Sequence, residues 1–539
     1  MKKLLLTLSV ILCLTSCASI EKHNTQITKL HPITDLHEDI DKVYIQLKRN
    51  HPRLYQYYSK EVLDFKFDSL KGAINTPMDS RTFYKQLAAV TKYVGQGHLS
   101  IAPPSKKYNK KERNNLSKSK FAINFLETEY LDEKLFIVDA LGQDSVLINA
   151  EVLKIEDETP QKLIKKYKRI IASDGYNTTF HNRVAGRRFF NYYTRDVGRF
   201  DSISFTLKLS DSTFVKKYKR GIGKDTTKID LVVAKKDSLS AIKKDKVKLT
   251  KAERKAKKVK AKALVKYNSK YGYTPIKFFP EVKKYNRNLN FVGQDSTVAL
   301  LKVQSFTKGN YERFYDETFT TLDSLKTKTL IIDLRNNFGG RLSEIAYLYS
   351  FLSDENVAFV NNSETKTRTP FLKSIMSNSN PLGIRVLAGV LSPFIAPVEL
   401  LKSSKKDGKL YYRLKQSKVS EAKALNFKGK IYVLINGNSF SASSVLSSQL
   451  HGTQRATFVG EETGGAYNGT VAGLMKTYVL PNTKIEAKIG LLFIDTKQKM
   501  STNGYGVKPD VEIIPTYQDR LNNIDPELHW VLEDIEAQK

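Results

Sequence analysis

Two turns that each follow an apolar run carry the residues best suited to chemistry. In the first, the run Ile431–Ile435 leads into a small-residue turn and then into a helical pattern that begins near Ser441. Such a turn can place a serine oxygen at a helix N-terminus, where partial positive charge and free backbone N–H groups favour developing negative charge. Serine is also a preferred helix cap, so this stretch alone leaves nucleophile and cap open.

The second turn carries paired glycines. The run Ile331–Leu334 is followed by polar residues and then by Gly339 and Gly340. Glycine lets the backbone approach a substrate closely, and N–H groups at such a turn can bind an oxyanion, an interaction worth about 10² to 10³ in rate per donor. A plain helix-entry turn would use the same glycines.

The order and spacing of these motifs resemble the tail-specific, or C-terminal-processing, serine peptidases. The matching stretches are Asp333-Leu334-Arg335-x-Asn337-x-Gly339-Gly340, Ser441-Ala442-Ser443, Arg455 to Gly464, and Gly506-Val507-Lys508-Pro509-Asp510. The resemblance implies an α/β fold with a crotonase-like layered peptidase core, a PDZ-like module and the hydrolysis of peptide bonds.

Carried over to this chain, the resemblance places the nucleophile at Ser441. Ala442 would donate one N–H group of the oxyanion hole, and Gly339 or Gly340 the other. Family members with a Ser–Lys dyad have the lysine twenty-five positions after the serine, where this chain has Ala466. We therefore do not expect that dyad.

A histidine base is expected instead. Gly97-His98-Leu99 resembles the Gly-His loop of the tricorn-like branch of the family, which takes its base from an N-terminal segment. An imidazole with an unperturbed pKa near 6.5 can accept the serine proton near neutrality and return it to the leaving amine. Outside this context, His98 would be an ordinary loop histidine.

The residue that orients the imidazole is an open point. The tricorn-like branch has a glutamate three residues before the closing Gly-Val, and this chain has Asn503 there. An asparagine can orient a histidine, but it cannot neutralise an imidazolium. Either Asp495 or Glu486 then takes this place, or the turnover is modest; Asn503 would otherwise be a simple turn residue.

The first twenty residues have the pattern of an export signal. Two lysines precede an apolar run from Leu4 to Leu14, and Leu14-Thr15-Ser16-Cys17 resembles the bacterial lipobox. We expect Cys17 to be acylated and the chain to be an exported lipoprotein of the cell envelope, attached to the membrane by this anchor. No later segment is expected to reach the about 18 apolar residues that a membrane span needs.

Composition favours a folded, basic protein. Hydrophobic residues make up 40% of the 539 residues, and the formal net charge is +34. Much of the excess lies between Lys235 and Lys266, with fourteen basic residues against three acidic ones. An exported lipoprotein has little occasion to meet nucleic acid, so we expect no nucleic-acid partner and interpret this run as a solvated insertion. A cationic binding arm is the alternative.

The pattern of apolar residues divides the chain. Helical spacing marks residues 35–94, short alternating runs mark 121–233, and strand, turn and helix signals repeat after residue 298. We therefore expect a signal peptide at 1–17, a tether at 18–34, an N-terminal helical domain at 35–105, a degenerate PDZ-like β-rich module at 118–234, a Lys-rich insertion at 235–270, a peptidase core at 290–518 with an insertion at 351–427, and a tail at 519–539.

The sequence thus predicts a serine peptidase that acts on polypeptide substrates at the cell envelope. We expect no cofactor, and no metal because no histidine has a partner at metal-ligand spacing. A catalytically weak or inactive peptide-binding protein of the same fold is the alternative, motivated by Ala466 and Asn503. An acyl-CoA enzyme of crotonase type shares the fold but would be cytoplasmic, which the lipobox argues against. The oligomeric state is left open.

Overall fold

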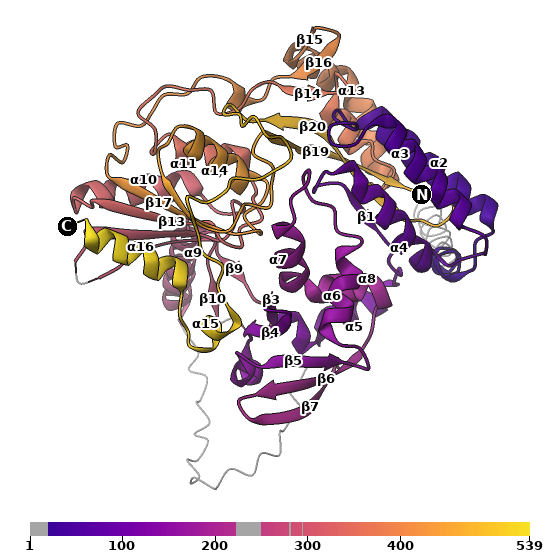
Figure 1. The fold of residues 1–539 in the computed structure, drawn as a ribbon, viewed down its shortest axis with the longest axis horizontal. Helices are drawn as coiled ribbons and strands as arrows, with labels where there is room; N and C mark the ends of the chain where they lie inside the picture. The colour runs from indigo at the N-terminus through magenta and orange to yellow at the C-terminus, as the bar shows by residue number, and fades with distance from the viewer. Residues whose placement is uncertain (1–19, 223–249, 280–281, 294, 539) are drawn as a thin grey trace.

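The computed structural model of the protein describes residues 20–222, 250–279, 282–293 and 295–538. Cys17 and the first part of the Lys-rich insertion, residues 235–249, lie outside the described residues. The described chain forms three larger sheets with helices around them (Figure 1).

A six-stranded sheet forms the centre of the C-terminal half. In order across the sheet, its strands are β11 (Arg287–Phe291), β12 (Val298–Val303), β13 (Thr329–Asp333), β17 (Lys430–Ile435), β18 (Thr457–Gly460) and β21 (Val511–Glu512). Within this sheet, only β11 runs antiparallel to its neighbour. β13 and β17 are buried along almost their whole length, as expected of central strands covered on both faces. The strands predicted at 298–303, 329–334 and 431–435 are confirmed.

Helices cover both faces of this sheet. Successive side chains of β13 point to opposite faces of the sheet. Ile332 packs into the hydrophobic cluster on one face, and Ile331 packs into the cluster on the other. The helices on the first face are α10 (Tyr311–Ser324), α11 (Leu342–Tyr349) and α14 (Ala442–Gly452), and the helix on the second is α16 (Pro526–Ala537). α11 and α14 confirm the helical patterns predicted after β13 and β17.

A second unit is built on a five-stranded antiparallel sheet. In order, its strands are β3 (Glu127–Leu131), β4 (Lys134–Asp139), β5 (Glu151–Ile155), β6 (Ser202–Leu209) and β7 (Ser212–Lys219). The strands predicted at 135–138 and 150–155 are confirmed, and the helix predicted at 160–171 is α6 (Pro160–Lys168). Between α6 and β6 the chain forms α7 (Thr179–Arg187) and α8 (Phe189–Val197), although the sequence pattern there predicts mainly strands.

The third sheet joins the two ends of the chain. Its strands are β1 (Ser100–Ala102), β20 (Glu486–Asp495), β14 (Ser363–Thr365), β16 (Lys409–Tyr412) and β15 (Ser403–Lys406), with β19 (Gly469–Val479) also paired to β20. β1 follows three helices that agree with the helical spacing of the N-terminal sequence: α2 (Ile33–Asn50), α3 (Lys60–Ala73) and α4 (Ser80–Thr91). Because β1 pairs with β20, this helical part is fixed to the C-terminal half.

Other helices and strands lie between these sheets or beside them in the sequence. They are α5 (Lys110–Lys118), β2 (Ser119–Lys120), β8 (Gly221–Ile222), α9 (Lys251–Ser269) in the Lys-rich insertion, β9 (Thr274–Pro275), β10 (Lys283–Lys284) and α15 (Tyr517–Leu521).

Residues 351–427, an insertion of poor periodicity in the sequence, contain a long apolar helix. α13 (Leu382–Lys402) follows α12 (Pro370–Ile375) and has 21 residues. By length and composition it is apolar enough to span a bilayer, so the expectation that no segment after the signal reaches this length is wrong. Pro393 and Pro397 favour irregular structure in the sequence, yet the helix continues through both.

Candidate active site

Ser441 lies at the sharp turn between β17 and α14. Its φ of 59° and ψ of −120° fall in a region that residues other than glycine rarely adopt. Although Ser441 is the N-cap residue of α14, its side chain makes no capping bond to the helix. Its Oγ instead lies 2.9 Å from Nε2 of His98. The turn therefore directs the hydroxyl away from the helix backbone and toward an imidazole.

Neighbouring serines fasten this turn to the rest of the core. Ser439 donates a hydrogen bond to the carbonyl of Leu334 at the end of β13, and Ser443 donates to the carbonyl of Asn337 in the glycine turn. Both serines are buried, so removing either hydroxyl would leave a buried carbonyl without this partner. These serines are structural, and they hold the Ser441 turn against the glycine turn.

Gly339 and Gly340 lie directly beside Ser441. A Cβ on Gly339 would come within 2.7 Å of the Ala442 nitrogen, and its φ of 91° also requires glycine. The N–H of Gly339 is donated to the Asn337 side chain at 2.8 Å. The N–H groups of Gly340 and Ala442 have no hydrogen-bond partner within the described residues. Of the three residues predicted for an oxyanion hole, Gly340 and Ala442 thus have a free donor, and the donor of Gly339 is occupied.

His98 comes from the N-terminal part of the chain. Its loop runs from a short 3₁₀ helix (Lys92–Val94) to β1, and its ring stacks on Phe440, the residue before Ser441, with centroids 4.7 Å apart. A Cβ on Gly97 would come within 2.7 Å of the same phenyl ring. The Gly-His pair therefore has a steric basis, because glycine lets the loop lie against Phe440 and so brings His98 to Ser441.

The other ring nitrogen of His98 contacts a residue that the sequence analysis does not single out. Nδ1 lies 3.1 Å from Oγ1 of Thr470, which is buried near the start of β19. The Thr470 hydroxyl also lies beside the carboxylate of Asp174, where it lowers the pKa of that group. Ser441, His98 and Thr470 thus form one chain of hydrogen bonds, and Asp174 lies beside its far end.

Asp174 is fully buried in the loop between α6 and α7. Its carboxylate accepts the N–H of Gly97 at 2.7 Å and the N–H of Ala466 at 3.3 Å. Ala466 stands where some family members have a lysine base, and here its backbone helps to hold the carboxylate. In the sequence, Ser173-Asp174-Gly175 has the composition of a solvated turn, and only the burial of Asp174 distinguishes it.

Burial shifts the pKa of both titratable groups. Burial, followed by the charge of Lys488, lowers the pKa of His98 to about 4. Burial raises the pKa of Asp174 to about 6, although the hydrogen bonds to its carboxylate oppose the shift. At neutral pH the imidazole is therefore uncharged and the carboxylate is ionised.

These protonation states fix the direction of each hydrogen bond. An ionised carboxylate can only accept a hydrogen bond, so the Thr470 hydroxyl directs its proton toward Asp174. The same hydroxyl then accepts the Nδ1–H of His98, which leaves Nε2 unprotonated and facing the hydroxyl of Ser441. The imidazole is thus in the tautomer that can take a proton from Ser441.

Asn503 does not lie at the imidazole. Its side chain is exposed in the loop after β20, and the nitrogen that it was predicted to orient faces Thr470. Asp495 is bonded to Asn361 and Lys499, and Glu486 is exposed at the start of β20. None of the three groups proposed from the sequence orients His98 in this structure, because Thr470 occupies the position beside Nδ1.

The Asp-Leu-Arg part of the glycine motif stabilises the fold. Arg335 is almost completely buried and forms ion pairs with Asp333 at 3.0 Å and with Asp525 at 2.7 Å. Asp525 is the N-cap residue of α16. The arginine therefore links the end of β13 to the C-terminal helix and is not part of the hydrogen-bond chain at Ser441.

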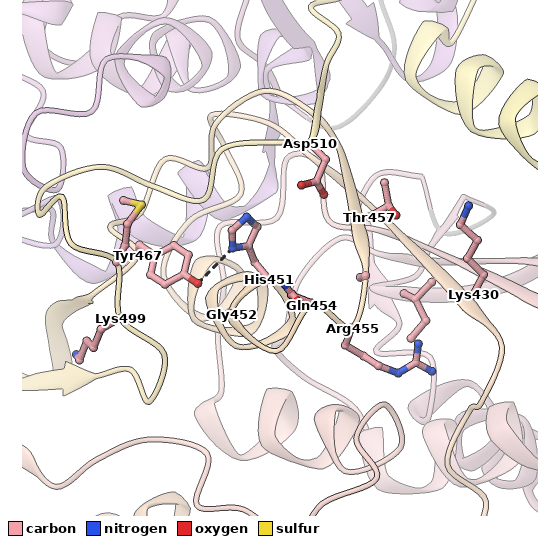
Figure 2. Close-up of a pocket in the computed structure, with 12 residues that line it drawn as sticks. Lys430, His451, Gly452, Gln454, Arg455, Thr457, Tyr467, Lys499 and Asp510 are labelled. Atoms are coloured by element: carbon pink, nitrogen blue, oxygen red, sulfur yellow. Dashed lines mark hydrogen bonds between the residues drawn. The ribbon is translucent and has the colours of Figure 1, made fainter.

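A cavity of about 770 Å³ lies at the opposite end of α14 (Figure 2). His451 points into it toward the Tyr467 hydroxyl, 3.2 Å from Nδ1, while Arg455 donates to backbone carbonyls. Neither Ser441 nor His98 lines this cavity. Among the described residues, no group of three or more His, Cys, Asp or Glu side chains is placed to hold a metal ion.

Comparison with known proteins links the segment that carries Ser441 to a family. Residues 297–513 match the model of peptidase family S41. Two structures of mature CPAF resemble the chain at 15% sequence identity. The complex with lactacystin has a TM-score of 0.55 over 91% of this chain and 95% of the CPAF chain; the other structure has a TM-score of 0.54 over 90% and 94%. At this identity the likeness shows the fold alone. No protein with a curated description matches the chain.

The chain has a mixed α/β fold, and a serine held against a histidine is an arrangement found in serine hydrolases. The family match narrows this class: residues 297–513 match peptidase family S41, and the chain is a serine-type peptidase. The resemblance to tail-specific serine peptidases, predicted from the glycine and serine motifs, is thereby confirmed.

Proposed function

We propose that this protein is a membrane-anchored peptidase of the cell envelope that cleaves polypeptides through an acyl-enzyme on Ser441. The observation that carries the proposal is the 2.9 Å contact between Ser441 Oγ and His98 Nε2, made by a serine in a strained backbone conformation. Such strain persists only where the surrounding structure enforces it, and it clusters at catalytic sites. A serine that merely capped α14 would need neither the strain nor the imidazole.

In the proposed reaction, Ser441 Oγ attacks the scissile carbonyl carbon while its proton passes to Nε2 of His98. The carbonyl oxygen becomes negatively charged beside the N–H groups of Gly340 and Ala442. When the C–N bond breaks, His98 gives the proton to the departing amine, and the acyl group stays on Ser441. Water then attacks the ester with His98 again as base, which releases the new carboxyl end and restores the serine.

We assign the orientation of His98 to Thr470 and Asp174. Thr470 holds the ring in the tautomer whose Nε2 accepts a proton, and Asp174 fixes the Thr470 hydroxyl. The charge of Asp174 also stabilises the imidazolium that forms when Ser441 is deprotonated. A carboxylate bonded directly to the imidazole has this role in Ser-His-Asp triads, and here one hydroxyl intervenes. Both groups are positioning residues.

The rest of the chain supports polypeptides as substrates and a membrane location. We assign the parallel sheet and its helices to a crotonase-like core, and residues 118–234 to a degenerate PDZ-like module. The order of β5, a turn and α6 supports the second assignment, and an antiparallel sheet with an edge strand such as β7 can hold an extended peptide by strand addition. The lipobox at Cys17 supports attachment to the envelope.

The proposal is tested on the chain that starts at Ala18. Wild-type protein should hydrolyse an unfolded polypeptide such as casein and react with a fluorophosphonate probe, and Ser441→Ala should abolish both. Ser447→Ala is the matched control, because Ser447 is buried in the same helix and its hydroxyl has no partner among the described residues. If wild-type protein neither cleaves nor reacts, and its peptide affinity survives Ser441→Ala, the protein is the inactive peptide-binding alternative.

A further inference from the structure

α13 leaves most of its apolar side chains exposed. Leu382, Phe394 and Leu401 are 70%, 76% and 79% exposed. At about 100° per residue, the exposed apolar side chains cover roughly 200° of the helix circumference. The two buried residues, Ala388 and Glu399, lie on the remaining side. An apolar surface of this breadth marks a contact with a partner or a membrane.

The single acidic residue of α13 is turned into the protein. Glu399 is 3% exposed, and its carboxylate accepts the N–H groups of Phe371 and Leu372 at the start of α12. The exposed side of α13 therefore carries no negative charge. The same contact ties the C-terminal end of the helix to α12, and at the other end Asn378, in the loop before α13, is bonded to Val479. Because both ends are held by the body, α13 lies along the surface and does not cross a bilayer.

Basic residues surround the helix. Between residues 366 and 413, nine Lys or Arg stand against two acidic residues, of which Glu399 is one. On α12, burial lowers the pKa of Lys373, and the nearby charges of Lys476 and Arg49 add to the shift. Two copies of the protein that met through this face would bring these like charges together, whereas anionic lipid headgroups would neutralise them.

The N-terminal end of the described chain and the loop before α13 are bonded to neighbouring residues of the same segment. Gln26 donates to the carbonyl of Asn482 at 2.8 Å, and Asn378, in the loop between α12 and α13, is bonded to Val479. Val479 and Asn482 are three residues apart, at most about 11 Å. Residues 20–28 are helical, so the chain rises only about 9 Å from Ile20 to Gln26, and the three steps from Cys17 to Ile20 add at most about 11 Å. Cys17 therefore lies within about 20 Å of Gln26, less than the length of α13. An anchor at Cys17 and α13 can therefore reach the same bilayer.

We infer that α13 is a membrane-contact helix that lies in the plane of an anionic lipid surface. Its apolar side enters the boundary between headgroups and acyl chains, and the basic residues of 366–413 face the headgroups, as in other interfacial amphipathic helices. This inference goes beyond the proposed peptidase function. It adds to the N-terminal anchor a second membrane contact, which fixes how the folded body is oriented on the bilayer.

The test uses the chain from Ala18 to Lys539, which lacks the acylation site. It is mixed with vesicles of phosphatidylcholine, alone or with phosphatidylglycerol, and the bound fraction is measured by flotation. We expect binding to the anionic vesicles, and a loss of about tenfold or more in the double variant Phe394→Glu, Leu401→Glu. The control variant Phe65→Glu, Val419→Glu changes residues on α3 and in the loop after β16 that are 67% and 69% exposed, and it should bind like wild type.

Two results would overturn the inference. One is the absence of vesicle binding, or binding that the α13 variant leaves unchanged. The other is a dimer in sedimentation experiments that the α13 variant converts to monomer without any vesicle binding, which would assign the helix to a contact between copies. Casein hydrolysis by the variants in solution shows that they are folded. Flotation needs no substrate, so its outcome is independent of whether Ser441 is the nucleophile.

Discussion

Asp174→Asn should lower kcat/KM for polypeptide hydrolysis by about two orders of magnitude. The Thr470 hydroxyl lies between the carboxylate and Nδ1 of His98, and two hydrogen-bond lengths in sequence correspond to a separation of about 6 Å. A unit charge at that distance stabilises the imidazolium by about 3 kcal/mol at an effective dielectric constant near 20, which corresponds to about 100-fold in rate. The imidazole is charged only as the reaction proceeds, so the loss should appear in kcat.

The pH dependence separates this role from a purely structural one. Catalysis requires neutral His98 and is aided by ionised Asp174, whose pKa values are about 4 and about 6. As the pH is lowered, kcat/KM should first fall when Asp174 takes up a proton near pH 6 and should then vanish when His98 is protonated near pH 4. In Asp174→Asn the first stage should be missing, because the charge is already absent. The two groups are linked through Thr470, so these stages belong to the pair.

Substitutions at Thr470 provide the control. Thr470→Val keeps the shape and removes the hydroxyl, so it should cost as much as Asp174→Asn, and the double variant should be little worse than either single one. Thr470→Ser keeps the hydroxyl and should retain most of the activity. The assay is steady-state hydrolysis across the acid range, with melting temperatures to show that each variant is folded. An Asp174→Asn variant with the wild-type kcat/KM and a two-stage pH profile would refute the reasoning.

Three further predictions concern the surroundings of the site. Gly339→Ala should lower kcat by about 10² or more, because the new methyl group would press on the Ala442 nitrogen in the oxyanion hole. Gly383→Ala on α13 is the control, since its methyl group would enter open space, and kinetics with casein measures both. Arg335→Met should reduce the free energy of unfolding by about 3 to 5 kcal/mol, because it leaves Asp333 buried without its main partner. The control Lys326→Met removes an exposed ion pair and should cost less than about 1 kcal/mol. Urea titration measures both. Lys488→Gln removes a charge that lowers the pKa of His98, so the more acidic stage of the pH profile should move upward while kcat at neutral pH is kept; an unchanged profile would contradict this effect.

The elements that carry Ser441 could be predicted because their signals are local. β13 and β17 are each built around a short apolar run, and small or polar residues after each strand mark the turn into a helix. The contact between His98 and Ser441 could be anticipated only through the family motif, since 343 residues separate them. No periodicity within the chain relates two positions so far apart.

Thr470 and Asp174 could not be predicted from the sequence. Threonine at the start of a strand and aspartate before a glycine are ordinary residues in such places. Their function arises from burial and from the meeting of β19 with a loop of another unit. For Asn503 the sequence spacing predicted a role at His98, but the residue lies in an exposed loop.

The helix α13 could not be predicted from the sequence because it contains two prolines. A proline within a helix leaves the carbonyl four residues earlier without its usual donor. For Pro393 this carbonyl belongs to Gly389, and the hydroxyl of Ser392 donates to it at 2.7 Å. The side chain thus replaces the missing backbone donor, a compensation that a count of prolines does not reveal.

The active site exists only when three parts of the molecule are packed together. Ser441 belongs to the parallel sheet, His98 to a loop fixed by the pairing of β1 with β20, and Asp174 to the unit that contains β3 to β7. The N–H of Gly97 donates to the carboxylate of Asp174. Gly175, which follows Asp174, donates its own N–H to the carbonyl of Gly95. The contacts that orient His98 therefore also dock the second unit onto the N-terminal part. Because catalytic geometry tolerates displacements of only about 0.5 Å, a slight separation of these parts should abolish hydrolysis while each of their cores stays folded.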